Sequence, residues 1–153
     1  MKEAIDSLDE VPRTLALFPE TRRWLEERGA PDDLIDLLRA FPFSSHAQFG
    51  SVSFSDVNQI PEYNDRPESK QLKVNGLLEI GSGLNGDPIV VNLETGTVGY
   101  VSHAELWEGT ATDIDEIHCD LGLSVAEFFL AAATDKAFPG DFFQALDFKQ
   151  ARG

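Results

Sequence analysis

Residues 76–103 read GLLEIGSGLNGDPIVVNLETGTVGYVSH, and this stretch decides the fold. It holds three apolar runs, 77–80, 89–93 and 98–102, of the kind that forms strands. Turn residues separate the runs, with Asn85-Gly86 between the first two and Glu94-Thr95-Gly96 between the next two. Because short turns join strands that run in opposite directions, the stretch predicts a central three-stranded antiparallel meander at about 77–102.

Helices are expected before this meander. Thr21–Arg28 has the pattern of a short helix, and Gly29 can take the left-handed conformation that ends many helices. Pro31 suits the start of a second helix, since its missing N–H costs nothing there. The apolar face of that helix repeats at helical spacing up to Pro42: Leu34, Leu37, Leu38 and Phe41.

The clearest helix signal follows the meander. Ser124 and Glu127 have the spacing of a capping box, in which each side chain accepts a backbone N–H of the other residue. The apolar residues beyond recur as on one helix face: Val125, Phe128, Phe129 and Ala132. A last helix is expected to begin at Asp141 and to bury Phe142, Phe143 and Leu146.

These elements predict an α+β fold, with an antiparallel-rich sheet and helices from both termini packed against it. Residues 1–153 are expected to form one domain. Its helical N-terminal part covers about 12–41, its sheet about 47–103, and its C-terminal helices about 124–150.

Two further segments lie between the first helices and the meander. Phe49–Ser55 predicts one strand, with Val52 and Phe54 on a common side. Ile60–Lys70 is rich in Pro, Asn, Asp and Glu, and it predicts a long exposed loop.

The composition excludes several classes of function. The chain has 12 Lys and Arg against 27 Asp and Glu, a net charge of −15, so nucleic acid and anionic membrane surfaces are not expected as partners. No apolar run approaches the roughly 18 residues that cross a bilayer, and Met1–Pro12 lacks the pattern of a secretory signal. Cys119 is the single cysteine, so no internal disulfide can form. We therefore expect a soluble, cytoplasmic protein.

The charge is unevenly distributed along the chain. Residues 74–135 contain no Lys or Arg but carry 11 acids: Glu79, Asp87, Glu94, Glu105, Glu108, Asp113, Asp115, Glu116, Asp120, Glu127 and Asp135. One interpretation is a solvated surface that aids solubility. The other is a negative face that steers a basic partner.

Residues 81–86 match the dinucleotide-binding pattern G-x-G-x-x-G, but their context does not. That site needs a helix after the glycines, whose N–H groups face the pyrophosphate. Here Asp87-Pro88 and a strand follow, so the glycines are expected to allow positive φ in a turn instead. No cofactor-binding residue is predicted.

The remaining residues include the side-chain types that metal and catalytic sites use. His103 with Glu105, and the run His118-Cys119-Asp120, contain ligand types, but their spacing matches no usual zinc pattern. No nucleophile lies in an elbow such as G-x-S-x-G. We predict neither metal ligands nor catalytic residues, and a small enzyme or metal-binding protein stays as an alternative.

The motifs of residues 76–103 resemble the core of the SUKH superfamily, which groups bacterial immunity proteins with a yeast cell-wall synthesis regulator. The similar features are Gly86-Asp87 in a glycine-rich turn, the Thr95-Gly96 turn, and Tyr100 before His103 and Glu105. The helix after Ser124, with its paired Phe128 and Phe129, extends the resemblance to roughly residues 75–135. The N-terminal part departs from the family pattern.

The resemblance implies an α+β fold and a role as an immunity protein that binds and blocks a bacterial toxin, often a nuclease. The acidic stretch agrees with such a role, because a nuclease needs a basic cleft for its substrate. We expect the partner, a basic toxin domain, to contact His103, Glu105, Trp107, Glu108, Asp113, Asp115 and Glu116. Trp107 is the expected anchor, since Trp is favoured at binding hot spots. The alternative is a regulatory interaction module with a non-toxin partner.

Overall fold

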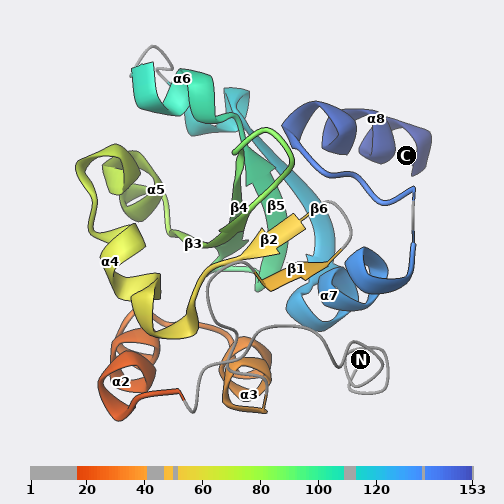
Figure 1. Ribbon diagram of the computed structural model, residues 1–153. Helices are drawn as coiled ribbons and strands as arrows, with labels where there is room; N and C mark the ends of the chain where they lie inside the picture. The colour runs from red at the N-terminus through yellow and green to blue at the C-terminus, as the bar shows by residue number, and fades with distance from the viewer. Residues whose placement is uncertain (1–16, 41–46, 50–51, 109–112, 136, 153) are drawn as a thin grey trace.

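The computed structural model describes residues 17–40, 47–49, 52–108, 113–135 and 137–152. Its strands form one sheet in the order β1-β2-β3-β4-β5-β6, in which each strand pairs antiparallel with its neighbour along the chain. The strands are β1 (Ala47–Phe49), β2 (Val52–Phe54), β3 (Leu77–Ser82), β4 (Pro88–Asn92), β5 (Thr97–Val101) and β6 (His118–Ser124). The predicted meander is confirmed as the centre of this sheet (Figure 1).

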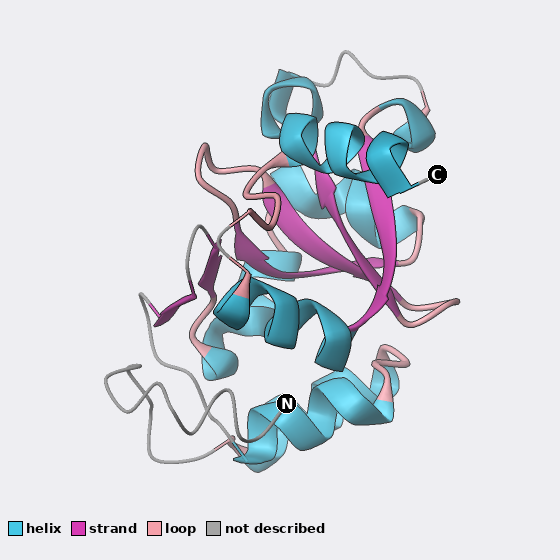
Figure 2. Ribbon diagram, turned by 90° about the vertical axis from the view of Figure 1, so that its right-hand side faces the viewer, coloured by secondary structure: helices cyan, strands magenta, loops and turns pink. Residues whose placement is uncertain are grey.

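Helices lie on both sides of the sheet (Figure 2), and the predicted α+β class is confirmed. The α-helices are α2 (Pro19–Glu27), α3 (Asp32–Ala40), α4 (Ile60–Asn64), α5 (Lys70–Val74), α6 (His103–Glu108), α7 (Val125–Thr134) and α8 (Phe142–Arg152). Short 3₁₀ turns are η1 (Val57–Gln59), η2 (Pro67–Ser69) and η3 (Ile114–Glu116). Among the helices described, none has the length and apolar character needed to cross a membrane.

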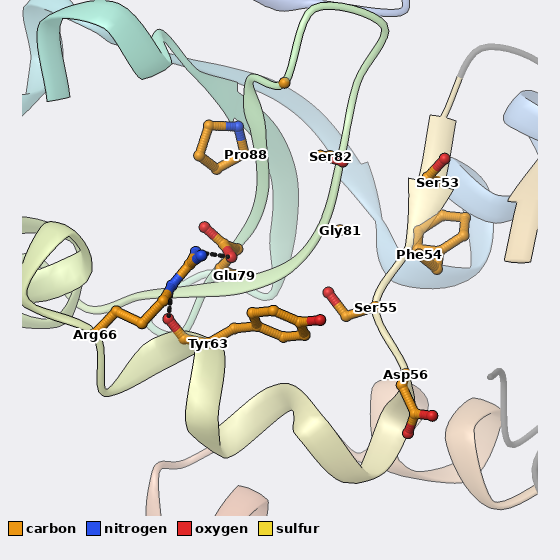
Figure 3. A pocket seen from close by; sticks show the side chains of 11 residues that line it. Ser53, Phe54, Ser55, Asp56, Tyr63, Arg66, Glu79, Gly81, Ser82 and Pro88 are labelled. Carbon is orange, nitrogen blue, oxygen red and sulfur yellow. Dashed lines mark hydrogen bonds and ion pairs between the residues drawn. The ribbon is translucent and has the colours of Figure 1, made fainter. Parts of the chain in front are cut away.

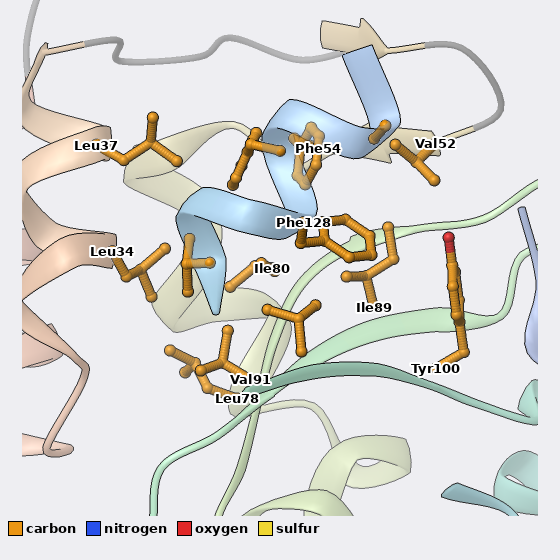
Figure 4. Packing of buried hydrophobic residues seen from close by; sticks show 14 of the residues in the cluster. Leu34, Leu37, Val52, Phe54, Leu78, Ile80, Ile89, Val91, Tyr100 and Phe128 are labelled. Atoms are coloured by element: carbon orange, nitrogen blue, oxygen red, sulfur yellow. The ribbon is translucent and has the colours of Figure 1, made fainter. Parts of the chain in front are cut away.

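Both faces of the sheet are buried. The larger core brings together side chains from α3, β2, β3, β4, β5 and α7, including Leu34, Phe54 and Phe128 (Figure 4). The smaller core lies under α5, α6 and η3 and contains Leu72, Leu77, Val90, Val101, Leu106, Ile114 and Ile117. Successive residues of a strand point to opposite faces, which is why Val90 and Val91 belong to different cores.

The helix after Ser124 is confirmed in detail. The Ser124 hydroxyl accepts the Glu127 N–H at 3.2 Å, and the Glu127 carboxylate accepts the Ser124 N–H at 3.0 Å. All four predicted face residues of α7 are buried: Val125, Phe128, Phe129 and Ala132. This face fixes α7 against β5 and β6.

The N-terminal helices reach the large core beside α7. Leu34, Leu37 and Leu38 of α3 are buried as predicted, and α3 packs chiefly against α7. Gly29 has the expected positive φ of 79°. Phe41, Pro42 and residues 12–16 lie outside the described residues.

The predicted loop at Ile60–Lys70 is wrong, because this segment contains α4 and η2 and ends where α5 begins. Asn64 can be buried because its side-chain amide forms hydrogen bonds with backbone groups of Ile60 and Glu79. Ser69 is also buried, and its hydroxyl donates to the Tyr63 carbonyl at 2.9 Å. These two polar residues therefore serve internal hydrogen bonds, while Glu62, Asp65 and Lys70 are exposed.

One strand prediction needs correction, and one strand was not predicted. Phe49–Ser55 is not one strand, since β1 and β2 pair antiparallel with each other, while residues 50 and 51 lie outside the described part. Val52 and Phe54 are nevertheless both buried, as the shared side predicts. The sequence also gave no prediction of β6, which closes the sheet beside β5.

The last helix buries a different set of residues from the one predicted. In α8, Phe142 is buried, but Phe143 is 63% exposed and Leu146 is 36% exposed. Ala145 takes the buried position, because residues 142 and 145 lie on the helix face toward the sheet. The prediction for Phe143 and Leu146 is therefore wrong.

The glycines of the turn between β3 and β4 have different roles, and only one of them has the predicted positive φ. Positive φ occurs there at Gly86, with a φ of 89°, but not at Gly81 or Gly83. A Cβ at Gly83 would overlap the carbonyl oxygen of Gly140, so this glycine lets the segment before α8 approach the turn. The Leu84 N–H donates to the same carbonyl at 2.8 Å.

Candidate partner-binding surface

The acidic surface predicted from the sequence is held by α6 and η3. Leu106 of α6, Ile114 of η3 and the adjacent Ile117 are buried in the smaller core. The Ser102 N–H donates to the Ile117 carbonyl at 2.8 Å and joins the start of α6 to the end of η3. The two short helices are thus fixed to the sheet by their buried apolar residues.

Three exposed acids lie in η3 or directly before it: Asp113, Asp115 and Glu116. The Asp113 carboxylate caps η3 by accepting the Asp115 N–H at 2.9 Å. None of the ion pairs among the described residues involves these three acids. Their charges are therefore open to a partner from solvent.

His103 has a structural contact that the sequence did not predict. Its backbone N–H and its ring Nδ1 both lie within hydrogen-bond distance of Oδ1 of Asp87, at 3.0 and 2.6 Å. The other oxygen of Asp87 accepts the Phe142 N–H at 2.9 Å. His103 begins α6 instead of ending a strand, and its side chain is 29% exposed.

Asp87 is a buried carboxylate that connects three parts of the chain. Burial alone would raise its pKa, but hydrogen bonds from His103, Phe142 and Asn85 hold the pKa below its ordinary value. The charged form therefore persists at neutral pH in the turn before β4. This explains the Gly86-Asp87 pair structurally: the aspartate accepts backbone N–H groups at the starts of α6 and α8.

Some of the predicted contact residues cannot be compared with the structure. The backbone of Glu105, Trp107 and Glu108 belongs to α6, which directly follows the third strand of the meander, as the prediction for Trp107 has it. The side chains of these three residues lie outside the described part of the chain. Their role as partner contacts stays a prediction.

The acids of residues 74–135 do not all contribute to one negative surface in the structure. Glu79 and Asp87 are buried and do not add to the surface. Burial lowers the pKa of His118 and raises that of Cys119, and the positive charge of Lys149 in α8 acts on both groups as a smaller, lowering influence. The stretch without Lys or Arg in the sequence is therefore approached by one cation from the C-terminal helix.

Cys119 and Asp120, from the run His118-Cys119-Asp120, do not point toward a common site. Cys119 faces the large core, and burial is the main cause of its raised thiol pKa. Asp120 accepts the Thr97 hydroxyl at 2.6 Å and the Gly122 N–H at 2.7 Å. In the described ranges, no group of three or more His, Cys, Asp or Glu side chains could hold a metal ion.

One feature that the sequence reasoning missed is a pocket beside β3 (Figure 3). Its volume is about 350 Å³, and Gly86 and Pro88, on either side of Asp87, form part of its wall. Glu79 and Arg66 form an ion pair inside it. The available signal was an acid within the apolar run of β3, since buried acids are rare unless they are paired.

The comparisons with known proteins do not identify a family. No protein-family model matches the chain, and the search of curated proteins found no match. The resemblance to the SUKH superfamily therefore stays a prediction from the motifs of residues 75–135.

Proposed function

We propose that the chain is an immunity protein that binds a bacterial toxin domain with a basic surface and blocks it. The proposal is supported by the SUKH-like motifs and by one observation that carries it. That observation is the exposed group of Asp113, Asp115 and Glu116, whose carboxylates take part in none of the described ion pairs.

The electrostatics favour fast association with a basic partner. Unpaired surface charges act over about 8 Å at physiological ionic strength, and acids that share one face add their fields. Such steering raises association rate constants more than it raises affinity, and the effect weakens with salt. A nuclease cleft, which is basic in order to hold phosphates, has the complementary charge.

The proposal includes a cytoplasmic site of action and no catalytic step. The single cysteine, Cys119, is buried and free, which agrees with a reducing compartment. Neutralisation then needs only that the acidic surface cover the basic cleft of the toxin. A gene for the toxin is expected beside the gene for this chain.

Charge reversal tests the electrostatic part of the proposal. Asp115→Lys combined with Glu116→Lys should slow association with the toxin domain about tenfold at low salt and flatten its salt dependence. The matched control is Glu27→Lys with Asp147→Lys, which changes the net charge equally at exposed positions of α2 and α8. Stopped-flow association rates compare the two variants.

The comparison of association rates between the η3 variant and the control variant decides whether the proposed surface binds the toxin. Slower association in the η3 variant alone supports the proposed surface. Equal slowing in both variants would mean that only net charge matters, and unchanged rates in both would remove electrostatic steering from the account.

A further inference from the structure

The pocket beside β3 exists because β2 leaves the sheet early. Strand β2 pairs with β3 only at Ser53–Ser82 and Phe54–Gly81. The last backbone bond from this segment is the Ser55 N–H to the Ile80 carbonyl at 3.0 Å. At Glu79, two residues before Gly81, the Asn64 side chain of α4 replaces a strand partner: it accepts the Glu79 N–H at 2.8 Å and donates to the Glu79 carbonyl at 3.0 Å. A space remains between the end of β2, helix α4 and β3, and it forms the pocket (Figure 3).

Glu79 presents its carboxylate to this space. Its neighbours Leu78 and Ile80 belong to the large core, so the Glu79 side chain points to the other face of the sheet. The residue is 7% exposed, and Oε2 accepts a hydrogen bond from Nη2 of Arg66 at 3.0 Å. Among the described residues Oε1 has no hydrogen-bond donor, although it is not sealed from solvent. A buried carboxylate with an unfilled acceptor is stabilised by any donor that reaches it.

Negative charge exceeds positive charge in the pocket lining. Glu79 and Asp56 carry carboxylates, and Arg66 is the one cation among those lining residues that the structure describes. Arg66 is held in place, since its Nε donates to the Tyr63 carbonyl at 3.1 Å and its guanidinium lies 5.2 Å from the centre of the Tyr63 ring. When Glu79 is ionised, Arg66 balances one of the two carboxylates, and one negative charge remains unbalanced.

The rest of the lining adds neutral acceptors and an aromatic ring. Ser53, Ser55 and Ser82 bring hydroxyl groups, and the ring of Tyr63 extends toward Ser55 (Figure 3). The net charge of −15 further concentrates cations around the protein. A volume of about 350 Å³ suits a short side chain and lies at the small end of ligand pockets.

We propose that this pocket binds an alkyl ammonium or guanidinium group, with Oε1 of Glu79 as its acceptor. The source of the group, a lysine or arginine side chain of the toxin, rests on the proposed function. The binding chemistry does not, since it follows from the pocket alone. Gly86 and Pro88 border the pocket on either side of Asp87, which holds the start of α6.

The protonation of Glu79 couples binding to pH. Burial raises the pKa of Glu79 to about 7, against the lowering effect of Arg66. Asp56 and Tyr63 also line the pocket, and α5 brings Lys70 and Lys73, both exposed, with Lys73 paired to Asp65. A bound cation favours the ionised carboxylate, so binding releases a proton below pH 7. The affinity should rise about tenfold from pH 6 to pH 8, following the ionised fraction of Glu79.

Titration with butylammonium chloride, followed by amide NMR shifts, tests the proposal without the toxin. Shifts should concentrate at Ser55, Glu79 and Ser82, while butanol, which lacks the charge, and acetate, which reverses it, should leave them unchanged. Glu79→Gln should weaken butylammonium binding at least tenfold at pH 8 and abolish its pH dependence. Glu94→Gln, an exposed acid in the β4–β5 turn, is the matched control and should bind as the native chain does.

A second variant keeps the test decisive if Glu79→Gln alters folding. Ser55→Leu narrows the pocket without touching the Glu79–Arg66 pair, and it should also abolish the shifts. Equal binding by Glu79→Gln and native protein, or shifts spread over the whole acidic surface, would overturn the pocket proposal. Butylammonium binding with no toxin partner would overturn the proposed function alone, and toxin binding without butylammonium binding would overturn the pocket alone.

Discussion

At the scale of single residues, Glu79 shows how burial and pairing compete. Its carboxylate gains one hydrogen bond from Arg66 but loses most of its hydration. The raised pKa of about 7 means that burial has the larger effect. An ion pair of this kind contributes little to stability, because the cost of desolvation exceeds the attraction.

The pH dependence of stability should report this balance. The native state keeps a proton on Glu79 between its ordinary pKa of 4.5 and about 7, whereas the unfolded chain releases it. The free energy of unfolding should therefore fall by about 2–3 kcal/mol as the pH rises through this range, and then level off. Urea unfolding at pH 5, 6, 7 and 8 measures the change.

Glu79→Gln provides the comparison for that experiment. The amide cannot ionise, so the variant should lose the Glu79 contribution to the slope, while Glu94→Gln should keep it. The same slope in Glu79→Gln and in the native chain would mean that Glu79 does not titrate near neutral pH.

At the scale of elements, one turn residue joins two helices to the sheet. Asp87, between β3 and β4, accepts N–H groups from His103 at the start of α6 and from Phe142 at the start of α8. The Tyr100 hydroxyl adds a bond to the Pro139 carbonyl at 2.8 Å, just before α8. The C-terminal helix is thus attached to the meander by polar contacts as well as by apolar packing.

Asp87→Asn should weaken these attachments. The amide keeps the shape of the carboxylate but offers one acceptor instead of two, so the free energy of unfolding at pH 7 should drop by about 2–4 kcal/mol. Asp115→Asn, at an exposed position, should change it by less than about 0.5 kcal/mol. Because the pKa of Asp87 is lowered in the native state, the difference between native chain and variant should be lost as the pH falls through that pKa. Equal stability at pH 7 would contradict the role of Asp87.

Sequence patterns predicted the elements whose signals are local. The capping box of Ser124 and Glu127 and the apolar spacing of α7 depend on neighbours along one helix, and both are confirmed. Helix α4 was missed because its Asn64 forms hydrogen bonds with the backbone of Glu79 in β3, fifteen residues away, and no local pattern indicates this contact. Strand β6 was missed as well, since it is specified by pairing with β5 rather than by its own composition.

At the scale of the molecule, the fold sorts the acids into different roles. The sheet places Glu79 and Asp87 inside, although only Glu79 carries a sign of this in the sequence, by standing within an apolar run. Asp113, Asp115 and Glu116 stay outside, as the predicted surface requires. Whether an acid of the sheet is buried depends on the face of the sheet that it occupies. The β-bulge between Glu79 and Gly81 in the β3–β4 pairing shifts the register, so this face is hard to derive from composition.

The central claim is that this chain neutralises a basic toxin by binding it. The most direct measurement is capture of partners from the source organism with the chain as bait, at low and at raised salt. The captured protein is then expressed in a sensitive host with and without the chain.

We predict capture of a basic toxin domain that is weakened by salt, kills the host when alone, and is harmless when the chain is co-expressed. Capture of a non-toxic protein, or of a toxin whose activity the chain leaves unchanged, would contradict the claim.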